Sequence, residues 1–597
     1  MRRLGKVLLH SVLVGALAGL AACLFFYALE WCEWLLQGEL ANFHPVKPDG
    51  EVHITPLPEG QPHAPRWWVL LTLPALGGLV CGFLVQRFAP EAAGPGSDAY
   101  IDAFHNRRGQ IPWHVPIVKL FASLVTISTG GSAGREGPVM QSCSGMGSTL
   151  SRIMRLEDHE RRILVVAGAA AGTGAIFRTP LGAALYAVEV LYRDDFESDA
   201  IVPSIIASVT GYSIFTTVYG QGNLFGTAES YAFEPMALPL YAAMAVGVSA
   251  FGIAFVSLRD ALAKHVFSPL RAKMPRMLVP AAGGAMLGLL ALLVPQALGT
   301  GYGLLQGAID VASWIPSERG YLLLWGLAAA KILSTSLTIT SGGSGGEFGP
   351  ALVVGGLAGG GFGLLFHQWL PGAVPQPGAF ALVGMGAMFG GVAHVPISSL
   401  IMVCEMTGSY DLLVPLMLAE GIAFVLLRTV KIFRAQVGMR VDSPAHRDEH
   451  TVDILEGMLA KDVYQHGEKL SVVEPADNLQ HVLEVISSAG YPGLLVRDDR
   501  GTIVGSISLD AVQGSILDAG LGSVAVAADV MMRPQLITPE DNLHDVLHAF
   551  LLSGMSVLPV VAQRRYDAEI LGVITQLDVT RAYEHAVTQR LLARPAA

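Results

Sequence analysis

Long apolar runs, separated by short polar or glycine-rich breaks, dominate residues 1–440 of the chain. The first run, residues 7–36, follows the basic side chains of Arg2, Arg3 and Lys6. It is long enough to cross a bilayer with some tilt, and it is longer than the apolar region of a cleaved signal peptide. We therefore predict a retained transmembrane helix, with a cytoplasmic amino terminus because basic residues favour that side.

Further apolar runs predict a series of helices, and several runs are shorter than the ~20 residues that cross a bilayer. Half-spanning and tilted helices are therefore expected. The predicted helices cover residues 67–85, 117–127, 139–150, 163–177, 181–191, 201–218 and 236–258, followed by 277–298, 321–339, 351–370, 380–389, 397–406 and 412–427.

The apolar part of the sequence is duplicated. Residues 134–138, Gly-Arg-Glu-Gly-Pro, have a near copy in the second half of this part, at 346–350, Gly-Glu-Phe-Gly-Pro. Residues 180–189 open on Pro-Leu and close on a glutamate, and residues 396–405 open on Pro-Ile and close on a glutamate. Duplicated halves in an apolar chain are typical of transporters and channels whose site lies where the repeats meet.

Composition places the chain in the membrane and excludes several functions. Only 15% of the residues are charged and 52% are hydrophobic, whereas a soluble chain carries about 25% charged residues. The net charge of −11 argues against nucleic acid as a partner. The five cysteines and seventeen histidines show no metal-ligand spacing, and no Walker A sequence is present. We expect a transport protein, with neither an enzyme activity nor a metal site.

Glycine-rich breaks precede predicted helices at residues 94–98, 130–138 and 341–350. The first free N–H groups of a helix point outward at such a start, and the macrodipole adds about half a positive charge. Two or three such ends that converge form an anion site without a fixed cation. The alternative is that these glycines only permit close helix packing. Because two of the three segments are internal copies, an anion site is favoured.

Three motifs carry a resemblance to a known family. Residues 134–138 are identical to the central signature of the CLC family of chloride channels and proton-coupled chloride exchangers. Residues 346–350 resemble that family's G-x-F-x-P element, and residues 180–182 leading to Glu189 are similar to its inner-path helix. The resemblance covers about residues 1–440.

This resemblance implies an architecture. The expected fold is an all-α polytopic membrane protein with half-spanning helices and two inverted repeats, about residues 1–195 and 200–440. The protein would be a homodimer in the cell (inner) membrane, with both termini cytoplasmic and one anion path in each subunit.

The resemblance also assigns roles to residues in the two copied segments. Glu136 would be the outer gating carboxylate, which competes with chloride or a similar small anion and carries a proton when it swings away. Arg135 flanks this gate, and the backbone near Glu136, Gly137, Glu347 and Phe348 would line the anion sites. An ionisable residue at membrane depth is functional by default. The alternative is that Arg135 and Glu136 form a structural ion pair.

Two departures from the family pattern affect the expected anion. Pro95, beside Gly96, replaces the serine whose hydroxyl usually faces the anion, and proline has no N–H to donate. Family members with proline at this position are associated with a preference for nitrate. Phe433 aligns with the tyrosine that usually supplies a second hydroxyl. Ser97 is a candidate substitute donor.

Two further departures affect the expected mechanism. The family's exchangers usually carry an inner proton-binding glutamate where this chain has Val190, which cannot relay a proton. Glu347 adds a carboxylate in a slot that is commonly apolar; it is a favourable charge at a helix start, or a second gate. The sequence favours a channel-like pathway because of Val190. The alternatives are a proton-coupled chloride or nitrate exchanger and a non-conducting membrane sensor.

A cytoplasmic α/β part is expected after a polar linker at residues 441–454. Residues 475–479, Pro-Ala-Asp-Asn-Leu, are repeated at 539–543 as Pro-Glu-Asp-Asn-Leu. Each copy continues with an amphipathic helix, an apolar strand, a turn and a glycine-led strand. This pattern resembles a pair of CBS domains, which we place at residues 455–518 and 525–590.

CBS pairs often bind adenine nucleotides between their repeats. The second repeat carries the expected signature at residues 572–578, which includes Thr575 and Asp578. In the first repeat Ser508 is the matching hydroxyl, but the acidic residue falls one position early. At most one nucleotide site is expected, and a docking or dimerisation role without any ligand is slightly favoured.

Overall fold

The computed structural model describes residues 2–52, 54–56, 64–226, 231, 234–446, 455–466, 472–489, 493–509, 511–513 and 525–592. The chain divides into two compact units, residues 1–445 and 446–597. Most of the expected linker, residues 447–454, and the last residues of the first expected CBS repeat, 514–518, lie outside the described residues.

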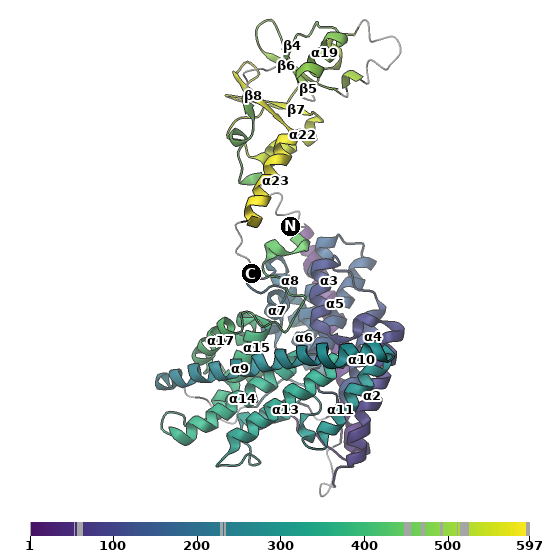
Figure 1. Cartoon of the computed structure of the whole chain (residues 1–597), viewed down its shortest axis with the longest axis vertical. Coiled ribbons are helices and arrows are strands. Elements are labelled where there is room, and N and C mark those ends of the chain that lie inside the picture. Colours follow the sequence, from purple (N-terminus) through teal and green to yellow (C-terminus); the bar gives the residue numbers. More distant parts are fainter. Residues whose placement is uncertain are drawn as a thin grey trace. The chain divides into compact units, whose positions relative to one another are not determined.

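The first unit is almost entirely helical (Figure 1). Its first half contains α1 (Arg2–Glu33), which continues as a π-helix (Trp34–Leu40), then α2 (Trp67–Phe88), α3 (Gly96–Asn106), α4 (His114–Ser128), α5 (Glu136–Ile153), α6 (Asp158–Phe177), α7 (Pro180–Glu189) and α8 (Ile201–Tyr219). Its second half contains α9 (Leu238–Leu262), α10 (Ser268–Lys273), α11 (Val279–Ala291), α12 (Tyr302–Ile309), α13 (Gly320–Ser341), α14 (Phe348–Trp369), α15 (Gly378–Ala393), α16 (Pro396–Thr407) and α17 (Leu413–Leu426).

The predicted all-α membrane fold is confirmed, with one broken segment. Within the described residues, six helices are long and apolar enough to cross a bilayer. Helix α7 has only 10 residues and so spans about 15 Å, half of the ~30 Å hydrocarbon core. The apolar run predicted as one helix at 277–298 ends as α11 at Ala291, where a turn follows, and a 3₁₀-helix then begins at Pro295. Helix α12 was not predicted.

Small residues let the helices approach closely. Helices α2 and α11 lie side by side (Figure 1). A methyl group added to Gly78 of α2 would collide with the Pro280 carbonyl, and one added to Gly284 of α11 would collide with the Pro74 carbonyl. Packing of this kind suits membrane helices, whose association depends on close backbone contact.

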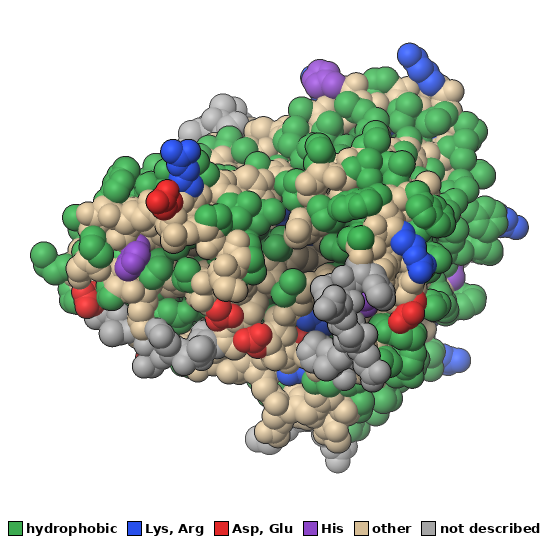
Figure 2. All heavy atoms as spheres, turned by 90° about the horizontal axis from the view of Figure 1, so that it is seen from below, with side chains coloured by type: hydrophobic (Ala, Val, Ile, Leu, Met, Phe, Trp, Pro, Cys, Tyr) green, Lys and Arg blue, Asp and Glu red, His purple; other side chains and the backbone are tan. Residues whose placement is uncertain are grey.

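The outer surface of this unit is apolar where its helices are exposed. Figure 2 shows hydrophobic side chains over much of one face, with few charged side chains among them. Leu24 of α1, Trp68 of α2 and Val425 of α17 are each about two-thirds exposed. A soluble protein rarely exposes so much contiguous apolar surface, whereas lipid covers it readily.

The two halves of this unit are inverted relative to each other. Glu189, the last residue of α7, accepts hydrogen bonds from the first free amides of α16, those of Ile397 and Ser398, at 3.1 and 2.8 Å. Glu405, near the end of α16, accepts from the corresponding amides of α7 at 3.2 and 2.8 Å. Each helix therefore ends where the other begins, so α7 and α16 run antiparallel as a reciprocally capped pair.

The second unit contains two repeats of strands and helices. Its elements are β3 (Gln465–His466), β4 (Val472–Val473), α19 (Leu479–Ala489), β5 (Gly493–Arg497), β6 (Ile503–Ser508), α21 (Ala527–Val530), α22 (Leu543–Ser553), β7 (Val557–Val561), β8 (Ile570–Thr575) and α23 (Gln576–Leu592). They form two three-stranded sheets, ordered β4-β5-β6 and β3-β8-β7. Side chains of both sheets, Leu495, Val557 and Val573, pack in one apolar cluster.

Candidate functional site

The two copied segments are joined at their centres. The Gly134 amide donates to the Gly346 carbonyl at 2.8 Å, and the Gly346 amide donates to the Gly134 carbonyl at 2.8 Å. These residues occupy the same position in the two repeats, so this reciprocal pair lies on the local twofold axis. The loops that precede α5 and α14 are thereby held against each other.

On each side of the glycine pair, a threonine hydroxyl of one repeat accepts a hydrogen bond from a serine amide of the other repeat. The Ser132 amide donates to Thr338 Oγ1 at 3.1 Å, and the equivalent Ser344 amide donates to Thr126 Oγ1 at 3.3 Å. All four residues are buried. Buried amides need partners when no water is present, so these bonds make a glycine-rich loop tolerable at membrane depth.

The first glycine-rich segment meets both copies. Strand β1 (Gly94–Pro95) pairs in parallel with β2 (Ser344–Gly345), so that Pro95 lies opposite Gly345. A methyl added to Gly96, the first residue of α3, would collide with the Gly137 carbonyl oxygen, and one added to Gly137 would lie 2.8 Å from the Gly346 Cα. The starts of α3, α5 and α14 are therefore neighbours, and only glycines permit this approach.

Glu136 is bound by the other repeat. It opens α5, is 2% exposed, and its Oε1 accepts a hydrogen bond from the Gly349 amide in the first turn of α14. Its Oε2 accepts from the Tyr302 hydroxyl of α12 at 3.2 Å. A free helix amide is a natural position for an anion. The carboxylate therefore occupies a place that a small anion could take.

Arg135 does not pair with Glu136, the alternative considered from the sequence. Its guanidinium forms a buried ion pair with Glu51 and lies over the rings of Phe26 and Tyr302, with centroids at 5.2 and 5.4 Å. The Tyr302 ring thus contacts Arg135 while its hydroxyl holds Glu136. The Arg135 charge is satisfied elsewhere, which leaves the Glu136 carboxylate to its amide and hydroxyl donors.

Glu347 is held by a buried ion pair. Its Oε2 accepts from Arg259 of α9 at 2.9 Å, and the two side chains are only 1% and 6% exposed. The same guanidinium donates to the carbonyls of Ile432 at 2.6 Å and Lys431 at 3.2 Å. Arg259 therefore ties the start of α14 to the segment that carries Phe433, which is 1% exposed.

The Phe433 segment is also tied to the Pro95 segment. Asp98, in the first turn of α3, accepts a hydrogen bond from the Ala435 amide at 3.0 Å. Ser97, the candidate substitute donor, lies beside Asp98 in the same turn and is buried. The structure thus connects Pro95, Glu347 and Phe433, which are far apart in the sequence, around the three helix starts.

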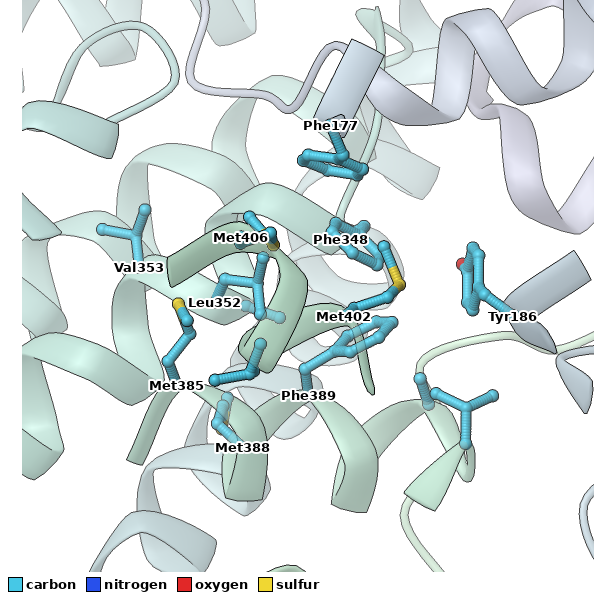
Figure 3. Packing of buried hydrophobic residues seen from close by; sticks show 14 of the residues in the cluster. Phe177, Tyr186, Phe348, Leu352, Val353, Met385, Met388, Phe389, Met402 and Met406 are labelled. Atoms are coloured by element: carbon cyan, nitrogen blue, oxygen red, sulfur yellow. The ribbon is translucent and has the colours of Figure 1, made fainter. Parts of the chain in front are cut away.

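An aromatic cluster packs on the start of α14. The Phe348 ring lies 4.7 Å from Phe177, 4.1 Å from Phe389 and 5.3 Å from Tyr186, measured between centroids (Figure 3). These rings come from α6, α15 and α7. They pack around the Phe348 ring and fix its orientation at the start of α14.

Val190 directly follows the last residue of α7. It is fully buried, and its carbonyl accepts from the Gln436 side chain at 3.1 Å. Its apolar side chain has no group that binds a proton. If protons pass this end of α7, another side chain carries them.

Sequence reasoning missed two buried lysines. Lys119 of α4 donates to the Gly94 carbonyl at 2.7 Å, Lys331 of α13 donates to the Gly299 carbonyl at 2.6 Å, and both side chains are fully buried. They occupy equivalent positions in the two repeats, so the offset between the copied motifs could have identified them. Each lysine therefore ties a buried helix to the backbone of a glycine-containing loop.

Among the residues that the structure describes, no group of three or more His, Cys, Asp or Glu side chains could hold a metal ion.

In the second unit, Asp578 of α23 accepts from the Thr575 amide and hydroxyl at 2.9 and 2.6 Å, and from Gln465 at 2.8 Å. Both of its carboxylate oxygens are therefore occupied. Ser508 ends β6 and accepts from the Ala511 amide at 3.3 Å.

Two inverted, interlocked halves with a buried carboxylate at their shared helix starts define a duplicated membrane transport protein. Residues 77–428 match the sequence model of the voltage gated chloride channel family. The chain therefore belongs to this family, and residues 526–585 match the CBS domain.

A relative supports this membership, and two solved structures share the fold. The chain is 32% identical to the H(+)/Cl(-) exchange transporter ClcA of Vibrio cholerae over 70% of this chain and 85% of that protein. It is similar to the crystal structure of a slow cyanobacterial Cl-/H+ antiporter, with a TM-score of 0.60 and 21% identity over 71% of this chain and 94% of that one. A eukaryotic CLC transporter has a TM-score of 0.54 and 16% identity, covering 96% of this chain and 98% of its own.

Proposed function

We propose that this protein exchanges a small monovalent anion, chloride or nitrate, for protons, with Glu136 as the gate. The observation that carries the proposal is the Glu136 carboxylate on the Gly349 amide of the other repeat. An anion that binds this amide displaces the carboxylate. The displaced carboxylate takes up a proton, so that anion and proton movements are linked.

The relatives also favour exchange over the channel-like pathway that Val190 suggested. The 32% identical Vibrio cholerae protein is named a proton/chloride exchanger. Val190 still favours a passive channel as the second candidate function, because the usual inner proton-binding side chain is absent. The third alternative, a non-conducting sensor, requires that the helix starts serve packing alone.

Ion flux from proteoliposomes distinguishes these functions. Purified protein is reconstituted with a chloride gradient and equal pH on both sides, and external chloride and pH are recorded together. Exchange predicts that chloride leaving the vesicles drives protons inward against a developing pH gradient. Chloride flux without proton flux would establish the channel, and the absence of both, with nitrate also tested, would favour the sensor.

The assembly and orientation of the protein remain predictions. The family resemblance implies a homodimer, and the basic residues before α1 favour cytoplasmic termini in the inner membrane. Crosslinking in membranes and protease access to the second unit from either side test these predictions.

Replacing Pro95 with serine is expected to raise the preference for chloride over nitrate. Pro95 is the residue before α3 and has extended backbone angles, which serine at a helix N-cap adopts without strain. The substitution adds a hydroxyl beside the proposed anion site while the three helix starts stay in place. The measurement is the ratio of chloride to nitrate flux in proteoliposomes.

The matched control for this prediction is Ser97→Ala. It removes the neighbouring hydroxyl of the same turn, and we expect it to leave the ratio unchanged. If Pro95→Ser has no effect and Ser97→Ala changes the ratio, then Ser97 is the hydroxyl that contacts the anion.

We also propose that the CBS pair acts in docking or dimerisation and does not sense nucleotides. Asp578, the acidic residue of the expected nucleotide signature, accepts hydrogen bonds from Thr575 and Gln465 on its two carboxylate oxygens. A nucleotide at 100 times its Kd would stabilise the folded unit by about 2.7 kcal/mol. We expect AMP, ADP and ATP to leave the Tm of the full-length protein unchanged. A Tm increase that Asp578→Asn removes would contradict this proposal.

A further inference from the structure

A second buried carboxyl group lies between α15, α16 and α17. Glu420, in the middle of α17, is 1% exposed. Its Oε1 accepts a hydrogen bond from the Ser399 hydroxyl at 2.6 Å. Its Oε2 is buried and has no hydrogen-bond partner. No ion pair to Glu420 is found within the described parts of the chain.

Glu189, which also lies at the start of α16, has more hydrogen-bond donors than Glu420. It accepts from two backbone amides of α16 and from the Ser398 hydroxyl at 2.6 Å. Several donors at a helix start stabilise the charged form of a carboxylate. Glu420 has a single hydroxyl donor, and a buried charge without compensation is costly. Glu420 is therefore better accommodated as the neutral acid, with a proton that it can release.

The two carboxyl groups flank one helix start. Glu189 binds Ser398 and Glu420 binds Ser399, and these serines are consecutive in the first turn of α16. Glu189 immediately precedes Val190, where family exchangers usually carry their inner proton-binding glutamate. Glu420 thus supplies a proton-binding group near the position at which this chain has an apolar side chain.

Helix α15 connects this carboxyl group to the anion site. A methyl added to Gly386 would lie 2.7 Å from Glu420 Oε1, and one added to Gly390 would lie 3.4 Å from the carboxyl carbon. These glycines provide the space for the group. Between them in sequence, Phe389 packs on Phe348 (Figure 3). Phe348 begins α14, and the amide of the next residue, Gly349, binds Glu136.

We propose that Glu420 is the inner proton-binding residue of the exchanger, in place of the side chain missing at position 190. The inference rests on the proposed function. Protonated Glu420 releases its proton to water and becomes a carboxylate held by Ser399. The Glu136 carboxylate, displaced by an anion, takes up the proton and becomes the acid. Glu420 is then reprotonated from the solution that faces its end of the unit.

The test compares proton and chloride flux in proteoliposomes for three forms of the full-length protein. Glu420→Gln keeps the shape and the Ser399 contact, so chloride flux is expected to persist while proton flux falls by on the order of 10²-fold. Glu405→Gln is the matched control. It alters the half-buried glutamate that caps α7, and it should leave the number of protons moved per chloride unchanged.

A rescue variant separates proton binding from a structural role. Val190→Glu, added to Glu420→Gln, restores the usual inner glutamate and is expected to recover proton flux. If Glu420→Gln yields no active protein, Gly386→Ala displaces the carboxyl group without removing it and should lower the proton-to-chloride ratio.

The outcomes are distinguishable. A wild-type protein that moves chloride without protons contradicts the proposed function itself. A coupled wild type whose ratio is unchanged in Glu420→Gln, or in Gly386→Ala where that variant is needed, overturns only the role of Glu420. The same holds if Val190→Glu fails to rescue proton flux, because Glu420 would then act through structure alone.

Discussion

Glu136→Gln is expected to abolish proton movement while chloride continues to flow. Glutamine has nearly the same shape but is neutral, so an anion displaces it from the Gly349 amide more easily than it displaces the carboxylate. Glutamine also cannot take up and release a proton. Proton flux in proteoliposomes should fall to the level of protein-free vesicles. Chloride flux should persist, because the helix amides that bind the anion are unchanged.

Glu405→Gln is again the matched control, since it alters a half-buried glutamate of α16 that caps the start of α7. It should leave both fluxes coupled. If proton flux survives in Glu136→Gln, then Glu136 does not carry the proton, even when the chloride flux is fully preserved.

Glu347→Ala is expected to destabilise the membrane unit strongly. Removing one partner of a buried ion pair costs about 3–5 kcal/mol, because the other charge stays buried. The cost here should lie near the lower limit, since Arg259 keeps Asp260 and the Ile432 carbonyl as partners. The measurement is the free energy of unfolding in mixed micelles.

Glu347→Gln is the companion variant that tests whether Glu347 also acts as a second gate. The amide oxygen can still accept from Arg259, so the loss of stability should be smaller than in Glu347→Ala. We expect the protons moved per chloride to stay at the wild-type value. A changed ratio in a stably folded Glu347→Gln protein would assign this carboxyl group to the transport path.

The duplicated architecture is predictable because its signals are local and repeated. The copy of Gly-Arg-Glu-Gly-Pro in the second repeat indicates which loops meet, and the structure joins them at Gly134 and Gly346. The paired glutamates at the ends of 180–189 and 396–405 likewise predict equivalent helices, although their reciprocal capping requires the three-dimensional arrangement. The membrane helices follow from apolar run length for the same reason.

The partners of the buried charges could not be predicted in this way. Arg135 pairs with Glu51, and Glu347 pairs with Arg259, and both pairs join segments that are far apart along the chain. Nothing in the periodicity of an apolar helix selects one distant partner over another. Tyr302 was missed because its short helix α12 follows a turn that the apolar run concealed.

The sequence favoured a channel over an exchanger, and the relatives favour the reverse. Val190 argued for a passive channel because a single expected position lacked a carboxyl group. A proton-binding group can instead come from another helix, and Glu420 lies on α17, in the other repeat, with no motif to mark it.

The central claim is that helix starts from both repeats share one anion site guarded by Glu136. Its most direct test is the anomalous diffraction signal of bromide in crystals of the wild-type and Glu136→Gln proteins. We predict bromide beside the first amides of α14 in both proteins, with an additional ion at the Gly349 amide when the carboxylate is replaced. Bromide bound elsewhere, with none at these helix starts in a preparation that transports it, would contradict the claim.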